Sequence, residues 1–469
     1  MSETLPPDPA PLSAPHPEAE PAKPGPARRT LAMLSLILAG EAVFVPIYHL
    51  NRYFKSSFEA VFQINASQIG DLFFWFGGVS MASYLLGGPI ADRFSPRVLL
   101  AGSLLLTGAG GLYMATIPGF KALQCLFAFW GASSILGFWA PLMRATREWG
   151  GQLAQGRAFG LLDGGRGLLS AVIASLATLL FASTLGDGQD PASQAAAVRA
   201  VLWFYAACCL AAAAGVWLCL PRSPSPAPPG GGGTANPPGG GATRGALLHR
   251  LTTVARLPAV WLQTVILFTA YASFRGFDNY GDYAEKAFGL DATQSASLAA
   301  GLSYLRAVAA LGAGWVADRW LGVSRTIALG FVTLIACFAL LIATPTTAAF
   351  YYLAVANMAV SAVAFFGLRG IYFALFEETR VPRAATGTAD GLISFIGFTP
   401  DTFFAKLHGW LVTVPEAQAA QMSPEAIAAA QLTGYQTLFT VLLALSAVGL
   451  AAAWLLGRLA ARATRVPDE

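Results

Sequence analysis

The sequence predicts an all-helical membrane protein in which twelve transmembrane helices form two pseudo-symmetric bundles of six. Three observations predict this fold class. Hydrophobic residues make up 55% of the 469 residues and charged residues only 12%, whereas a soluble domain carries about 25% charged residues. The apolar residues occur in blocks of roughly 20, the length of helix that crosses about 30 Å of hydrocarbon. A stretch rich in Pro and Gly divides these blocks into two groups of six.

The blocks follow one another along the chain in a regular order. Residues 1–29 have neither an apolar core nor a cleavage pattern, so we expect a disordered tail. Residues 221–257 cannot pack or span a membrane and are expected to form a flexible linker, and residues 461–469 form a second tail. The N-terminal bundle, residues 30–220, contains apolar segments near 31–53, 68–91, 98–117, 121–143, 157–183 and 198–220. The C-terminal bundle, residues 258–460, contains segments near 258–281, 294–317, 325–344, 347–375, 384–411 and 433–457.

The distribution of Lys and Arg predicts the orientation of the protein. With the N-terminus in the cytoplasm, the cytoplasmic tails and loops carry 19 Lys and Arg. The opposite side then carries 6, with Arg52 and Lys55 counted among them. Loops rich in Lys and Arg remain on the cytoplasmic side during insertion. We therefore expect a multi-pass protein of the inner membrane with both termini and the linker in the cytoplasm.

An internal repeat relates the two bundles. The pattern Gly-x-x-x-Asp-Arg occurs at 88–93 and again at 314–319, each time at the end of the second segment of a bundle. Asp163 follows Asp92 by 71 residues, and Asp390 follows Asp318 by 72. Transporters built from such repeats place the substrate site at the repeat interface, near the middle of the bilayer. Two further pairs lie at similar offsets, namely Arg144 with Arg369 and Arg52 with Arg275.

Residues 87–97 and 314–319 resemble the loop signature of the major facilitator superfamily, and the resemblance covers about residues 30–465. Within the superfamily, residues 138–150, 156–168 and 274–283 are most similar to the organic anion and sugar-phosphate permease branch, which is organophosphate antiporter-like. The resemblance implies a transporter that works by alternating access.

The same resemblance suggests roles for particular residues. In the permease branch, one arginine of helix 1 and one of helix 7 hold a phosphate, and Arg52 and Arg275 are the matching residues here. The helix-5 histidine of that branch is absent, and Asp163 and Arg166 occupy its region.

The repeated loop signature also has a mechanical interpretation. Asp92 lies at a helix end beside the N-terminus of the next helix, where a carboxylate is favoured. It can pair with arginines of neighbouring helices and hold one conformation. The predicted conformational latch consists of Gly88, Asp92, Arg93 and Arg97 in the first bundle and Gly314, Asp318, Arg319 and Arg325 in the second.

Charged residues inside the apolar segments are the candidate functional residues, because each needs a partner or a polar cavity. The predicted substrate-binding residues are Arg52, Arg166, Arg275, Arg306 and Arg369. The predicted coupling or charge-pair residues are Glu41, Asp163, Asp278 and Asp390.

Sequence spacing suggests how these charges pair. Asp163 with Arg166 and Asp278 with Arg275 are three residues apart on one helix, so each pair can form an ion pair. Asp390 has no such neighbour and is expected to reach Arg369. Arg52 either belongs to the site or extends to the outer interface of the membrane.

The interior cations are all arginine, whose planar guanidinium suits a carboxylate, phosphate or sulfonate. We therefore expect a secondary transporter of a small organic anion, such as a sugar phosphate, a sulfonated sugar or a carboxylate. The alternative function is proton-coupled export of hydrophobic drugs, and a third hypothesis is a membrane sensor that does not transport. No Gly-x-x-x-x-Gly-Lys-Ser/Thr pattern or metal-ligand spacing is present, so we expect no cofactor, metal or enzymatic activity. The expected partners are an anionic solute and membrane lipid, without nucleic acid, and the protein is expected to be a monomer.

Overall fold

The computed structural model describes residues 26–150, 155–186, 190–221, 252, 255–375 and 386–463. The regular elements of this part of the chain are all helices. The first bundle consists of α1 (Pro26–Ala42), α2 (Val45–Tyr53), α3 (Lys55–Phe62), α4 (Ala66–Arg93), α5 (Pro96–Met114), α6 (Phe120–Ser133), α7 (Trp139–Gly150), α8 (Gln155–Leu185) and α9 (Pro191–Cys219). The predicted tails and the linker fall largely outside the described residues.

The second bundle contains four short helical turns in addition to its longer helices. It consists of α11 (Pro258–Gly276), η1 (Phe277–Asn279), α12 (Tyr280–Phe288), α13 (Ala292–Ser303), α14 (Leu305–Val316), η2 (Ala317–Leu321), α15 (Val323–Ala343), η3 (Ala348–Phe350), α16 (Tyr351–Ile371), η4 (Tyr372–Ala374), α18 (Thr386–Gly397), α19 (Pro400–Val412), α20 (Glu416–Ala419) and α21 (Pro424–Ala463).

These helices account for the twelve predicted membrane crossings. In the described part of the chain, seven helical runs are long and apolar enough to cross a membrane, and α1 with α2 make an eighth as a pair bent by 56°. The long helix α4 and the kinked runs α6–α7, α11–α12 and α18–α19 supply the remaining crossings. The all-helical fold predicted from the sequence is confirmed.

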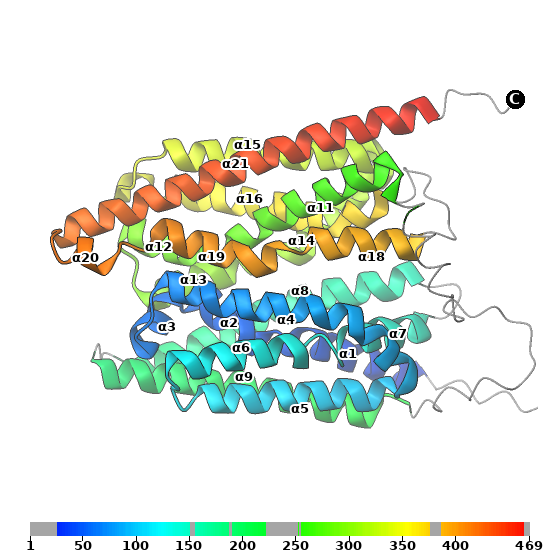
Figure 1. The fold of residues 1–469 in the computed structure, drawn as a ribbon, viewed down its shortest axis with the longest axis horizontal. Coiled ribbons are helices and arrows are strands. Elements are labelled where there is room, and N and C mark those ends of the chain that lie inside the picture. The colour runs from blue at the N-terminus through cyan, green and yellow to red at the C-terminus, as the bar shows by residue number, and fades with distance from the viewer. Residues whose placement is uncertain are drawn as a thin grey trace, which may run out of the picture.

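The two bundles lie side by side with their helices roughly parallel, as Figure 1 shows. We call the end at which α1 begins and α21 ends the termini end, where α7 and α18 also lie. The opposite end, which carries α3, α12 and α20, is called the far end. Large apolar side chains are exposed on the outside of the bundles, such as Tyr352 at 81% and Leu218 at 76%. Lipid in place of water explains this exposure.

Several crossings are interrupted in mid-membrane, and the sequence gives local reasons. Pro46 opens α2 and Pro400 opens α19, and a proline cannot donate the backbone hydrogen bond that would continue the preceding helix. In the seventh crossing, η1 changes the helix to a 3₁₀ turn at Phe277–Asn279. Such interruptions often mark hinges and binding sites in transporters.

The two bundles touch mainly at the far end and near mid-membrane. The main helix pairs that connect them are α4 with α19, α8 with α13 and α14, α2 with α13 and η1, and α3 with α12. In the described residues, α7 and α18 at the termini end pack mainly within their own bundles. The structure is therefore closed at the far end.

Glycines allow α4 and α19 to approach until their backbones touch. A Cβ atom added at Gly70 would lie 2.5 Å from the Cα of Lys406, and one at Gly77 would lie 2.5 Å from the Cα of Thr402. In the opposite direction, a Cβ at Gly409 would overlap the backbone of Ala66. The far-end contact therefore depends on residues without side chains on both helices.

Candidate functional site

Four charged side chains form a continuous chain of ion pairs between the bundles, which we call the ion-pair chain. Arg52 of α2 donates from Nε to Oδ1 of Asp278 at 2.5 Å. Arg275 of α11 donates from Nη1 to the other oxygen of Asp278 at 2.9 Å, and from Nε to Oδ1 of Asp401 at 2.5 Å. The hydroxyl of Tyr271 also donates to Asp401, at 2.9 and 3.0 Å. Two cations and two carboxylates are thus balanced in the interior.

Helix interruptions position the members of the ion-pair chain. Arg275 and Asp278 lie on either side of the start of η1. Asp401 lies in the first turn of α19, where the helix dipole favours a carboxylate. The ring of Tyr48 from the first bundle lies 4.2 Å from the guanidinium carbon of Arg275. These contacts occupy all three nitrogen atoms of the Arg275 guanidinium, because Nη2 also pairs with Asp401.

Three further arginines, Arg166, Arg306 and Arg369, are less completely paired, and we call them the three-arginine cluster. Arg306 donates from Nη2 to Oδ1 of Asp163 at 3.0 Å, whereas Nε of Arg166 lies 3.9 Å from Oε2 of Glu41. The Nε atoms of Arg166 and Arg306 are buried and have no hydrogen-bond partner within the described residues. Arg369 forms no ion pair with any residue that the structure describes.

Unpaired donors in a low-dielectric interior are costly, because each loses its hydration without replacement. The side chain of Asp163 is 43% exposed, although the Arg306 side chain beside it is 10% exposed. Asp163 lies eight residues into α8 from the termini end, about 12 Å at 1.5 Å per residue. Of this cluster, the contact with Asp163 is therefore the part that is open to the surroundings, in the half of α8 nearer the termini end.

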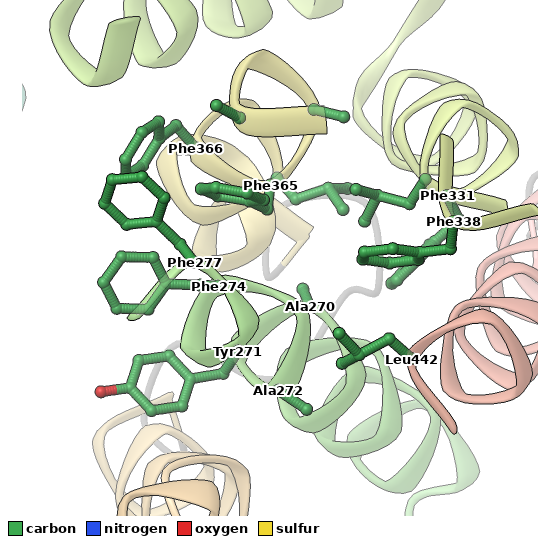
Figure 2. Close-up of a cluster of buried hydrophobic side chains, with 14 of the residues drawn as sticks. Ala270, Tyr271, Ala272, Phe274, Phe277, Phe331, Phe338, Phe365, Phe366 and Leu442 are labelled. Carbon is green, nitrogen blue, oxygen red and sulfur yellow. The ribbon is translucent and has the colours of Figure 1, made fainter. Parts of the chain in front are cut away.

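A row of aromatic rings on α11 and η1 separates the two groups of charges. Figure 2 shows Tyr271 and Phe274 of α11 and Phe277 of η1 in a row on the same side, with the Tyr271 and Phe274 rings tilted by 43°. The Phe274 ring centroid lies 4.3 Å from the guanidinium carbon of Arg369, 5.5 Å from that of Arg52 and 5.7 Å from that of Arg275. The negative face of an aromatic ring attracts cations. Phe274 therefore partly compensates the charge of Arg369.

The structure corrects one predicted pairing. Asp163 and Arg166 do not pair with each other, because Asp163 faces Arg306 of the second bundle and Arg166 faces Glu41 of α1. The predicted contact between Arg275 and Asp278 is present at 2.9 Å. Arg52 is buried and paired with Asp278, so it does not extend to the outer interface in this structure. The side chain of Asp390, and with it the expected pair with Arg369, lies outside what the structure describes.

A second interior charge group lies at the far end, and the sequence analysis did not single it out. The ammonium group of Lys55 in α3 lies 3.4 Å from Oδ2 of Asp282 and 3.1 Å from Nδ1 of His408. Lys286 lies 3.1 Å from the other oxygen of Asp282, and the Tyr435 hydroxyl donates to the same carboxylate. Lys55 comes from the first bundle and its partners from the second. This far-end charge group therefore joins the bundles where they close.

A small cavity of about 20 Å³ lies between the ion-pair chain and the far-end charge group. Polar residues from both bundles line it, among them Asn51, Lys55, Arg275, Asn279 and His408. The amide oxygen of Asn51 is buried there without a hydrogen-bond partner. The volume suits about one water molecule, so a larger solute can enter only if the surrounding side chains move.

The structure describes only part of the predicted latch. The surroundings of Gly88 and the side chains of Asp92 and Arg93 lie outside what it describes. Arg97 stacks over Trp217 at 4.5 Å. Asp318 and Arg319 are exposed on η2, a π-helical turn, and Asp318 forms no ion pair with a described residue. The latch therefore stays a prediction.

Three interior residues were missed by sequence reasoning, namely Asp401, Lys55 and Asp282. Asp401 lies inside the predicted segment 384–411, so its charge and the preceding Pro400 were available signals. Lys55 and Arg52 were counted with the outer loops, and both are buried in the structure. No sequence pattern indicates that α3 packs on α9 and brings Lys55 into contact with the second bundle.

Comparisons with known proteins agree with this architecture. The sequence profile of the Major Facilitator Superfamily matches residues 30–400. Over 388 residues the chain is 24% identical to the inner membrane protein YihN of Escherichia coli strain K12, and the match covers 82% of this chain and 88% of YihN.

Solved structures show the same fold at low sequence identity. A bacterial homologue of the human lysosomal transporter Spinster, in an inward-facing and unoccupied conformation, superposes with a TM-score of 0.70 at 15% identity. That match covers 95% of this chain and all of the homologue. The nucleoside transporter NupG superposes with a TM-score of 0.63 at 16% identity, over 92% of this chain and 98% of NupG.

Proposed function

Since this chain belongs to the Major Facilitator Superfamily and is a multi-pass secondary transporter of the inner membrane, not an enzyme, we propose that its solute is a small organic anion. A sugar phosphate, a sulfonated sugar and a carboxylate are the candidate solutes. Alternating access of the two bundles moves the solute across the membrane.

The observation that carries this proposal is the excess of guanidinium donors in the three-arginine cluster. Its three cations face two carboxylates, Glu41 and Asp163, among the described residues. The buried Nε atoms of Arg166 and Arg306 have no partner there. A bound anion supplies the missing acceptors and the missing negative charge. A hydrophobic drug supplies neither.

Arg52 and Arg275 have a different part in this proposal. Asp278 and Asp401 already occupy their guanidinium groups. A solute can bind these two arginines only where it replaces one of those carboxylates. We therefore assign first contact with the solute to the three-arginine cluster, and to Arg52 and Arg275 a contact that follows rearrangement.

The proposed orientation places the termini end in the cytoplasm, in line with the bias in Lys and Arg. Burial of Arg52 and Lys55 removes two cations from the outer side and strengthens that bias. Ala235→Cys, in the linker, is expected to react with a membrane-impermeant maleimide only after the cells are opened. Labelling of intact cells at this position would overturn the orientation.

The proposed function is tested by a thermal-shift panel on the purified protein. Glucose 6-phosphate, glucose 6-sulfate, gluconate and inorganic phosphate are compared with neutral glucose. A ligand that binds the folded state stabilises it by mass action, by about 2.7 kcal/mol at a hundredfold excess over Kd, and this raises the melting temperature. We expect at least one anion to raise it, and uptake of that anion into proteoliposomes to follow. Stabilisation by hydrophobic cations alone would favour the drug-exporter alternative.

A further inference from the structure

An open groove of about 640 Å³ lies at the termini end between the start of α11 and the end of α21. Its volume falls in the range of roughly 300–1,000 Å³ that is typical of small-molecule pockets. Arg256 and Arg458 stand at its rim, while Trp261, Val265 and Leu455 line its length. The groove lies outside the solute route proposed above, and nothing in that proposal uses it.

Neither arginine of the groove forms an ion pair with a residue that the structure describes. The guanidinium carbon of Arg458 lies 3.5 Å from the ring centroid of Trp454, which holds the side chain at the rim. The Trp261 indole donates a hydrogen bond of 2.7 Å to the carbonyl of Ala255, which fixes its ring beside Arg256.

The apolar part of the groove runs along the membrane normal. Within α11 the lining runs from Pro258 to Val265, seven residues or about 10 Å at 1.5 Å per residue, and Arg256 lies in the turn just before the helix. That length is about two thirds of the depth of one leaflet, which is half of the roughly 30 Å hydrocarbon core. Trp261 and Trp454 are about half exposed, at 45% and 52%, as tryptophans at a membrane interface are.

We propose that this groove binds one anionic phospholipid of the leaflet at the termini end. The phosphate lies between Arg256 and Arg458, and an acyl chain lies along Val265 and Leu455. A polar rim with two cations beside an apolar channel about two thirds of a leaflet deep fits a phospholipid, whereas a water-soluble anion would leave the apolar channel unfilled. Anionic lipids are attracted to basic side chains at the cytoplasmic surface by about 1 kcal/mol per side chain, or about fivefold in affinity.

Photo-crosslinking of the full-length protein tests the proposal. The protein is placed in phosphatidylcholine nanodiscs that contain a small amount of phosphatidylglycerol with a photoactivatable acyl chain. We expect crosslinked peptides from residues 255–265 and 454–459. Added phosphatidylglycerol should compete for this labelling, whereas added phosphatidylcholine and free glycerol 3-phosphate should not.

Variants make the test specific for the rim arginines. Arg256→Gln with Arg458→Gln should reduce the labelling about thirtyfold, because two contacts of about fivefold each are lost. Arg28→Gln with Arg144→Gln removes the same charge from the termini end of the other bundle and should leave the labelling unchanged. The proposal would be overturned if phosphatidylcholine competed as well as phosphatidylglycerol, or if the wild-type protein were crosslinked outside residues 255–265 and 454–459. Both outcomes are read from the wild-type protein, so they hold even if the double variant does not fold. Competition by glycerol 3-phosphate would indicate a site for soluble anions instead.

Discussion

Replacing Asp278 by asparagine is expected to destabilise the protein by about 3–5 kcal/mol, because the change leaves a buried arginine without its counter-charge. Asp278 is shared by Arg52 from the first bundle and Arg275 from the second. Arg275 retains Asp401, whereas Arg52 has no other carboxylate within salt-bridge distance in the described residues. Thermal unfolding in detergent, compared with the wild type, measures the loss.

A double variant separates lost charge balance from lost packing. Arg52→Met with Asp278→Asn removes one cation and one anion together and leaves Arg275 paired with Asp401. We expect it to recover most of the stability that Asp278→Asn loses, because a balanced buried pair contributes little net stability. If the single and double variants melt at the same temperature, the ion-pair chain does not act through charge balance.

Replacing Arg369 by methionine is expected to weaken binding of the proposed anionic solute about a hundredfold while the protein stays folded. Two charge-assisted hydrogen bonds from one guanidinium contribute about 3 kcal/mol, which equals a factor of roughly one hundred in Kd. Among the described residues no carboxylate pairs with Arg369, and its contacts there are with aromatic rings, so we expect the folded state to tolerate this change. Arg369→Lys keeps the positive charge but lacks the planar guanidinium that binds an anion through two hydrogen bonds, so it should give an intermediate loss of affinity.

The measurement for Arg369 is anion binding by calorimetry, with unfolding followed in parallel. Arg199→Gln removes an exposed arginine from α9 and serves as the control with unchanged affinity. Wild-type affinity in Arg369→Met would remove this residue from the site. Unfolding of Arg369→Met would instead show that its cation balances a group inside the protein.

The fold was predictable because hydrophobicity and the repeated Gly-x-x-x-Asp-Arg pattern are properties of the chain itself. The ion pairs were only partly predictable from the sequence. Spacing of three residues places Asp278 beside Arg275, and the structure has that contact. The same spacing places Asp163 beside Arg166, yet each faces a different helix. Arg166 packs so closely against α1 that a Cβ added at Gly40 would lie 2.9 Å from its Cδ.

Tertiary packing decides why Asp278 pairs with Arg275 whereas Asp163 does not pair with Arg166. Spacing along a helix shows which side chains share a face, but not which neighbouring helix presents the stronger counter-charge. For Asp163 that neighbour is Arg306, 143 residues away in sequence. The predicted single first segment likewise became two helices, α1 and α2, although Pro46 was a local signal for the break.

The glycine contact between α4 and α19 has a consequence for the kinetics of opening. At Gly70 and Gly409 the two helices touch through backbone atoms, whereas at Gly77 the side chain of Thr402 also lies in the contact. At the first two points the helices can part without any rotamer change. The ion pair of Lys406 with Asp71 across the same helices, at 2.9 Å, is partly exposed and therefore weak. The activation barrier to opening the far end then comes chiefly from separating the buried charges that join the bundles, namely Lys55 from Asp282 and His408, and Arg52 from Asp278.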